Sequence, residues 1–383
     1  MTMFSWSARL SLWLALAALG PSGCGARTIH LDGKPSDGGS SNPNSTPDAI
    51  APGVSIVIEN EETAMRIAVD DARVYWLSRL PDNPSASRAR FARVRSCQKS
   101  DCAATIVTYD ELSADLGGGT FHYFQELAVH GGNIYWARSS GTADHSILSC
   151  PSAGCSGPPK TVVPNVRLTT MAVDETHVYW TFYVDGAIMR RSLTGADAPQ
   201  AIALNESQPD QILVDATHVY WIANRGMAHA AVKRVAKQGG EPPVTLVMEQ
   251  NQASSLALDS DFFYWANDYS VGAISRCPLS GCAGAPAMLI AGQAHPSALV
   301  TDGKSIFWMN WTGEPTGVQG RAAVLRCPVG ACASALETLA IQTFASGGLS
   351  MAVDQSDVYW VAQGEDATNY GVFPHATIYR HAK

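Results

Sequence analysis

Residues 171–180 read MAVDETHVYW, and near copies of this phrase occur seven times along the 383-residue chain. The copies are IAVDDARVYW (67–76), LAVHGGNIYW (127–136), MAVDETHVYW (171–180), ILVDATHVYW (212–221), LALDSDFFYW (256–265), LVTDGKSIFW (299–308) and MAVDQSDVYW (351–360). Their starts are 60, 44, 41, 44, 43 and 52 residues apart. A period in the low forties is the size of one four-stranded blade of a β-propeller.

Each phrase has the pattern of two β-strands joined by a tight turn. The apolar run before Asp174 is typical of a strand buried on both faces, and a second strand begins at Val178. Asp174 stands where an Asx-type turn would satisfy backbone N–H groups. Trp180 closes the phrase and is predicted to pack between neighbouring blades, since such a side chain buries roughly 150–250 Å². The alternative role for the Trp series is a stacking platform for sugars.

The two ends of the repeat region predict how the ring closes. The seventh unit stops at ATIYRHAK (376–383), after its third strand, whereas GVSIVIEN (53–60) is a β-rich run with no blade of its own. Pairing these segments would complete the last blade and remove an exposed sheet edge. We therefore expect an all-β, seven-bladed propeller of four-stranded blades closed by an N-terminal strand, with six or eight blades as alternatives.

The N-terminal residues predict an exported protein. An apolar run, Leu10 to Leu19, follows Arg9 and has the length of a signal-peptide core. Cys24 follows Ser-Gly as in the lipobox of bacterial lipoproteins, where that cysteine is lipidated; an ordinary cleavage site in a secreted protein is the alternative. Residues 25–52 are rich in Gly, Ser, Pro and Asn, which predicts a flexible tether. The predicted domains are thus a signal peptide (1–24), a tether (25–52) and a propeller (53–383). The protein is expected at the bacterial outer membrane or in the periplasm with a lipid anchor, or else secreted.

Charge and composition narrow the function classes. The net charge is −8, 46% of the residues are hydrophobic, and no run of Lys or Arg stands out. Nucleic-acid binding needs a basic stripe to displace counterions from phosphates, so no nucleic-acid partner is expected. Contact with a membrane is expected only through the lipid anchor.

The stretch VYWTFYVDGAIMRRSLTGAD (178–197) is similar to the YWTD repeats of lipoprotein-receptor propellers, and this resemblance covers residues 53–383. It implies a propeller and no particular function. Two features depart from the family pattern: no copy has Asp directly after the Trp, and the family usually has six blades.

Eight cysteines form four pairs with one spacing. Each pair lies between the predicted third and fourth strands of a unit, where a hairpin would place the two sulfur atoms at bridging distance. Disulfides are therefore expected, in agreement with export; zinc ligation is the alternative. The pairs are Cys97 with Cys102, Cys150 with Cys155, Cys277 with Cys282, and Cys327 with Cys332.

Loop lengths suggest where a binding site lies. From the Trp to the third-to-fourth-strand hairpin the chain has 19 to 21 residues in units 6, 7 and 1, and 12 to 14 in the others. Long loops on a rigid scaffold are where binding residues concentrate, although insertions there are also tolerated without function. The predicted patch, for a protein, peptide or glycan, comprises Trp311, Asn310, Glu314, Asp366, Tyr370, Phe373, His375, Arg79, His122 and Tyr123.

The central channel is the alternative site. Residues predicted to enter the first strands include Gln125, Asp210, Gln252 and His295. A propeller hydrolase, lactonase or lyase would place a metal or an acid–base pair there. One His and one Asp are weak evidence for a general acid–base pair. Calcium prefers several carboxylates, and these residues include only one. We expect a binding or scaffolding protein rather than an enzyme, with no cofactor or metal ligand assigned and a structural calcium ion left open.

Overall fold

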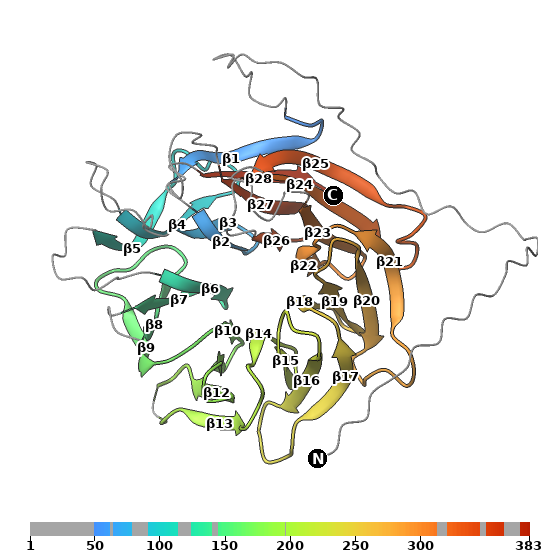
Figure 1. Cartoon of the computed structure of the whole chain (residues 1–383). Helices are drawn as coiled ribbons and strands as arrows, with labels where there is room; N and C mark the ends of the chain where they lie inside the picture. The colour runs from blue at the N-terminus through green and yellow to red at the C-terminus, as the bar shows by residue number, and fades with distance from the viewer. Residues whose placement is uncertain are drawn as a thin grey trace, which may run out of the picture. The chain divides into compact units, whose positions relative to one another are not determined.

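The computed structural model describes residues 50–61, 64–78, 91–113, 124–139, 145–195, 197–311, 320–344, 350–363 and 376–383. Within these ranges the chain forms seven four-stranded antiparallel sheets, which stand as blades around a central channel (Figure 1). The seven-bladed β-propeller predicted from the repeat is confirmed. In the described ranges no helix has the length and apolar character needed to cross a membrane. The predicted signal peptide and Cys24 lie outside the described residues.

Every blade runs from an inner strand at the channel to an outer strand at the rim. The inner strands are β2 (Ala64–Val69), β6 (Phe124–His130), β10 (Met171–Val173), β14 (Asp210–Val214), β18 (Ala253–Leu258), β22 (Ser297–Thr301) and β26 (Met351–Val353). The second strands are β3 (Arg73–Ser78), β7 (Asn133–Ser139), β11 (His177–Phe182), β15 (His218–Ala223), β19 (Phe262–Asn267), β23 (Ser305–Trp311) and β27 (Asp357–Gln363).

The two remaining positions of each blade complete the sheets. The third strands are β4 (Phe91–Gln98), β8 (His145–Pro151), β12 (Ala187–Ser192), β16 (Ala230–Ala236), β20 (Gly272–Pro278), β24 (Gly320–Pro328) and β28 (Ala376–Ala382). The outer strands are β5 (Val107–Ser113), β9 (Lys160–Val166), β13 (Gln200–Ala203), β17 (Val244–Gln250), β21 (Ala287–Gln293), β25 (Glu337–Phe344) and β1 (Val54–Glu61). Blades 1 to 7 begin at β2, β6, β10, β14, β18, β22 and β26.

The antiparallel path gives the ring two different faces. The turns after the inner strands and the hairpins between third and outer strands lie on one face, which we call the turn face. The loops between second and third strands and the links between blades lie on the other, which we call the loop face.

The Asp of the repeat holds the first turn of its blade. In blade 3 the Oδ1 atom of Asp174 accepts hydrogen bonds from the N–H groups of Thr176 and His177, both at 2.8 Å. Its Oδ2 atom accepts the hydroxyl of Tyr179 at 3.0 Å. The predicted Asx-type turn is therefore present. The same pair of backbone bonds forms at Asp70, Asp215, Asp259, Asp302 and Asp354.

The core consists of seven apolar clusters, each between two neighbouring blades. The repeat Trp side chains are at most 2% exposed and lie in these clusters. A single sheet would leave both faces apolar, and stacking against its neighbours covers them. The predicted packing role of the Trp series is confirmed.

Five of these Trp side chains also donate a hydrogen bond across the blade junction. The indole N–H reaches an oxygen atom on the outer strand of the preceding blade at 2.9–3.2 Å. The donor and acceptor pairs are Trp76 and Glu61, Trp136 and Asp110, Trp265 and Gln250, Trp308 and Gln293, and Trp360 and Gln342. Each bond fixes the Trp against one neighbour and satisfies a buried donor that would otherwise destabilise the junction.

The ring closes through β1, which pairs antiparallel with β28. Val54 lies opposite His381, Ile58 opposite Ile378, and Glu61 opposite Ala376. Figure 1 shows β1 on the outer side of β28 and beside blade 1. The junction between blades 7 and 1 has its own apolar cluster, like the other six. The predicted closure by the N-terminal strand is confirmed.

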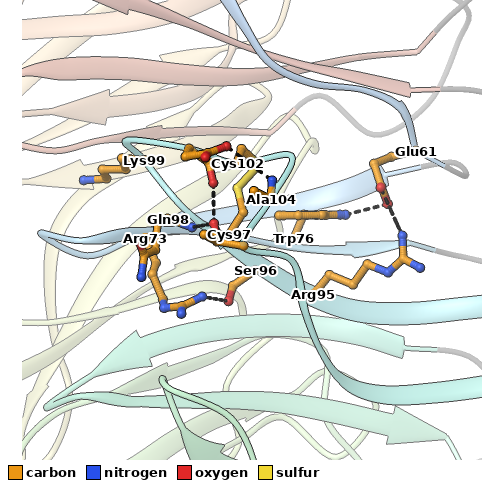
Figure 2. The surroundings of a disulfide bond; sticks show 12 residues. Glu61, Arg73, Trp76, Arg95, Ser96, Cys97, Gln98, Lys99, Cys102 and Ala104 are labelled. Carbon is orange, nitrogen blue, oxygen red and sulfur yellow. Dashed lines mark hydrogen bonds and ion pairs between the residues drawn. A yellow bond between two sulfur atoms is a disulfide. The ribbon is translucent and has the colours of Figure 1, made fainter.

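All four predicted cysteine pairs form disulfides, with Cα–Cα distances of 4.7 to 5.3 Å. They close the turn-face hairpins of blades 1, 2, 5 and 6, and Figure 2 shows the bond between Cys97 and Cys102 in blade 1. Blades 3 and 4 have no cysteines there and instead turn through Gly195 and Gly239, whose φ angles of 77° and 70° favour glycine. Four disulfides indicate an exported protein.

Candidate functional site: the loop-face mouth of the channel

A cavity of about 560 Å³ occupies the channel and is lined by residues from all seven blades. Its size falls in the range of small-molecule sites in proteins. The lining residues at the start of each inner strand are Arg66, Glu126, Thr170, Gln211, Ser255, Ala298 and Ser350. These starts lie toward the loop face, so the polar end of the cavity is the loop-face mouth.

β-Bulges near the start of the inner strands orient these side chains. Five inner strands have a register shift against their second strands at this level, in blades 1, 2, 4, 5 and 6. A bulge of this kind bends the strand and redirects a side chain. In blades 4 and 6 the bulge brings Gln211 and Ala298 to a φ of 51°, which costs a non-glycine residue about 1–3 kcal/mol. Backbone strain of this kind is more frequent at functional sites than elsewhere, which supports the mouth as a candidate site.

Hydroxyl groups at the mouth join one blade to the next. The Oγ atom of Ser350 in blade 7 accepts the N–H of Ile67 in blade 1 at 3.1 Å, which is a second contact across the closure. Ser255 in blade 5 accepts the N–H of Leu299 in blade 6 at 2.9 Å. In the same way Thr170 accepts the N–H of Ile212 at 3.2 Å. On three inner strands, a backbone N–H group is thus hydrogen-bonded to a hydroxyl oxygen of the preceding blade.

Two arginine–carboxylate pairs lie at the mouth. Arg66 donates from Nε and Nη2 to Oε1 of Glu126 at 3.3 and 3.0 Å. Arg225 donates from Nη1 to Oδ2 of Asp210 at 3.1 Å and from Nε to the carbonyl oxygen of Ser254 at 2.6 Å. The pairs come from blades 1 and 2 and from blade 4.

The members of each pair differ in exposure. The side chains of Arg66 and Arg225 are 40% and 41% exposed, whereas those of Glu126 and Asp210 are only 10% and 12% exposed. Burial raises the pKa of Glu126, and Arg66 opposes that effect. Glu126 in turn raises the pKa of Arg66. The carboxylates therefore act as buried supports, and the guanidinium groups face the cavity.

Two residues of the predicted loop patch are described. Trp311 lines the channel cavity and is half-buried at the end of β23. Asn310 accepts the indole N–H of Trp308 at 3.0 Å and donates to Gln293 at 2.9 Å, so its amide belongs to a blade junction. The other predicted patch residues lie outside the described residues, and their role stays a prediction: Glu314, Asp366, Tyr370, Phe373, His375, Arg79, His122 and Tyr123.

The four predicted channel residues border the mouth without facing the cavity themselves. Asp210 holds Arg225, and Gln125 donates to the carbonyl oxygens of Leu168 and Thr169 in blade 3. His295 is 2.9 Å from Asp268. Gln252 contacts its neighbours through its backbone: its N–H donates to the carbonyl oxygen of Met227, and its own carbonyl accepts the N–H of Asp268. The lining begins one or two residues later, at Glu126, Gln211, Ser254 and Ser297. The channel role of the four predicted residues stays a prediction.

A second cavity of about 770 Å³ opens on the turn face at blades 6, 7 and 1. Two of its acidic side chains form ion pairs. Lys383 binds Asp302 at 2.6 Å, and Lys99 forms an ion pair with Asp354. No three His, Cys, Asp or Glu side chains gather as metal ligands in the part of the chain that the structure describes.

Comparisons with known proteins identify the fold only. No family model and no curated protein matches the sequence. The chain is similar to the structure of a streptogramin B lyase, with a TM-score of 0.55 and 11% identity over 86% of this chain and 97% of that one. It is also similar to a chain of a nidogen/laminin complex, with a TM-score of 0.45 and 14% identity over 73% of this chain and 91% of that one. A phage phi92 endosialidase has a TM-score of 0.49 and 10% identity, over 86% and 68% of the two chains. These neighbours have different roles, and at such identities the likeness extends to the propeller fold alone.

Proposed function

We propose that this protein is a non-catalytic binding or scaffolding propeller of the bacterial cell envelope, which recognises a protein, peptide or glycan on its loop face. The observation that carries the proposal is the polar mouth of the channel, where buried carboxylates hold two half-exposed arginines in a cavity that Trp311 also lines. Ligand sites combine a concave surface with a few fixed polar groups, and this mouth has both. The long loops of blades 6, 7 and 1 would extend the same face.

The disulfides and the N-terminal sequence support export and a lipid anchor at Cys24. Val54 begins β1 on the turn face, beside the C-terminal strand β28. A tether that ends there would enter the propeller on the face opposite the channel mouth. The loop face would then be free for a partner. The YWTD-like repeat pattern is compatible with such a binding role.

The test is to probe glycan and peptide arrays with the mature chain and its variants. We expect binding that is lost in Trp311→Ala and in Gln211→Gly, where glycine tolerates the positive φ and only the side chain is removed. Gln355→Ala, on the turn face, is the matched control and should bind as the wild type does. The proposal fails if the wild-type protein binds nothing, or if its binding persists in both loop-face variants.

A second candidate function is a channel hydrolase, lactonase or lyase. The observation in its favour is Glu126, because a buried carboxyl whose pKa is raised can hold a proton and serve as a general acid. Lactone hydrolysis and elimination assays with wild type and Glu126→Gln would establish it if turnover is present and the variant lacks it. Absence of turnover in the wild type would leave the binding role.

A further inference from the structure

The channel mouth leaves several hydrogen-bond donors for a ligand. Arginine has five N–H groups, and Arg66 uses those on Nε and Nη2 while Arg225 uses those on Nε and Nη1. In the described part of the chain, Nη1 of Arg66 and Nη2 of Arg225 have no partner. The carboxylates of Glu126 and Asp210 already fix both guanidinium groups, so binding a ligand does not require ordering them.

The hydroxyl groups add to this donor surface. Ser255 and Ser350 accept backbone N–H groups through their oxygen atoms, and each retains one O–H hydrogen to donate. Among the described residues neither hydrogen has another acceptor. Both serines line the cavity. A ligand that complements the mouth must therefore bring acceptors, and a carboxylate is one of the anions whose geometry matches guanidinium donors.

Trp311 and the hydrogen-bonded N–H groups of the inner strands indicate what kind of molecule would carry these acceptors. A half-buried indole in a polar cavity can stack on the apolar face of a sugar ring, while hydroxyl donors reach the ring oxygens. A peptide that added a strand would need free backbone N–H groups on an inner strand. Those of Ile67, Ile212 and Leu299 are already taken. The mouth suits a saccharide better than an extended peptide.

We propose that the loop-face mouth binds a carboxylate-bearing saccharide, with Arg66 and Arg225 binding the carboxylate and Trp311 contacting a sugar ring. This inference rests on the proposed binding function and names its ligand class. Glu126 holds the Arg66 guanidinium at 3.0 Å, and Asp210 holds that of Arg225 at 3.1 Å, so both are positioned before a ligand arrives.

The experiment measures binding of the mature, disulfide-bonded chain by calorimetry to oligogalacturonate, oligoalginate, hyaluronan oligosaccharides and sialyllactose. Each is paired with its methyl ester, which keeps the rings and removes the charge. We expect at least one acid to bind about tenfold or more tightly than its ester, and the difference to shrink as salt is raised. This comparison needs only the wild-type protein, so it does not depend on whether a variant folds.

Variants then locate the carboxylate. Arg66→Gln and Arg225→Gln should each weaken the acid about tenfold and leave the ester unchanged. Arg93→Gln, which removes an arginine paired with Glu111 on blade 1 away from the cavity, is the matched control and should change affinity less than twofold. Thermal unfolding of each variant checks the fold.

Two results would overturn the inference without touching the proposed function. One is equal binding of acid and ester that is still lost in Trp311→Ala. The other is array binding at the loop face by acidic peptides while none of the four saccharides binds. If the wild type binds nothing on arrays or in calorimetry, the proposed function itself fails.

Discussion

Glu61 is predicted to hold the ring closed. It lies on β1, is 6% exposed, and its carboxylate accepts the indole N–H of Trp76 at 2.9 Å. It also binds the Nη1 atom of Arg95 at 3.0 and 3.1 Å. Figure 2 shows both contacts converging on the one carboxylate. Since Trp76 and Arg95 belong to blade 1, this side chain joins the N-terminal strand of blade 7 to the first blade.

The cost of Glu61→Ala follows from the groups it would leave behind. An unsatisfied buried N–H costs about 1–3 kcal/mol, and removing one partner of a buried ion pair costs about 3–5 kcal/mol. Both groups share one carboxylate, so the costs overlap and we expect a loss of about 3–5 kcal/mol. Glu61→Gln keeps an acceptor for Trp76 and loses only the charge, for which we expect about 1–2 kcal/mol.

Urea unfolding of the oxidised chain, followed by Trp fluorescence, measures these losses. Glu59→Ala is the control, because Glu59 is exposed on the same strand and should change stability by less than about 0.5 kcal/mol. The order of stability should be wild type and Glu59→Ala, then Glu61→Gln, then Glu61→Ala. A Glu61→Ala protein within about 1 kcal/mol of the wild type would refute the closure role of Glu61.

Three further perturbations test the fold. Replacing Cys97 and Cys102 by Ser should cost about 2 kcal/mol in urea unfolding, because the closed loop is short; no loss would show that the hairpin is held without the bridge. Ser350→Ala should cost about 1–3 kcal/mol by leaving the closure N–H unsatisfied, and a neutral result in the same assay would contradict the capping role. Burial raises the pKa of Asp354, but hydrogen bonds from Lys99 and two backbone N–H groups outweigh it and lower that pKa to about 2; the pKa of Asp174 is lowered too. Both ionised carboxylates then stabilise the fold fully above about pH 4, and that contribution should disappear as the pH falls toward 2; unchanged urea midpoints over that interval would contradict it.

The sequence contained enough signal for the architecture because each blade repeats the same local chemistry. In six of the seven phrases an Asp six residues before the Trp predicted a turn, and the backbone N–H groups of the next residues complete it, as Asp174 shows. The missing fourth strand of the last unit predicted the pairing of β1 with β28. The separation of five residues within every cysteine pair predicted the disulfides. All of these signals are local in sequence or concern the ends of the chain.

The contacts between blades were harder to predict, because they join residues whose separation in sequence varies. The acceptors for the Trp side chains lie 15 residues before Trp76, Trp265 and Trp308, but 26 before Trp136 and 18 before Trp360. A polar residue 15 positions before the Trp was the available signal, and links of different length between an outer strand and the next inner strand obscure it.

The lining of the channel mouth was missed for a different reason. Arg66 and Glu126 are 60 residues apart in sequence, and their pairing follows only from the placement of blades 1 and 2. The lining also begins one or two residues after the predicted channel residues. Neither Arg66 nor Arg225 belongs to the repeated phrase.

A crystal structure of the mature chain with its tightest array ligand would show whether the ligand binds at the loop-face mouth of the channel. We predict ligand density against Trp311, with acidic groups at hydrogen-bond distance from Arg66 and Arg225. Density at the turn face or on the outer strands, with the mouth filled only by solvent, would contradict the claim.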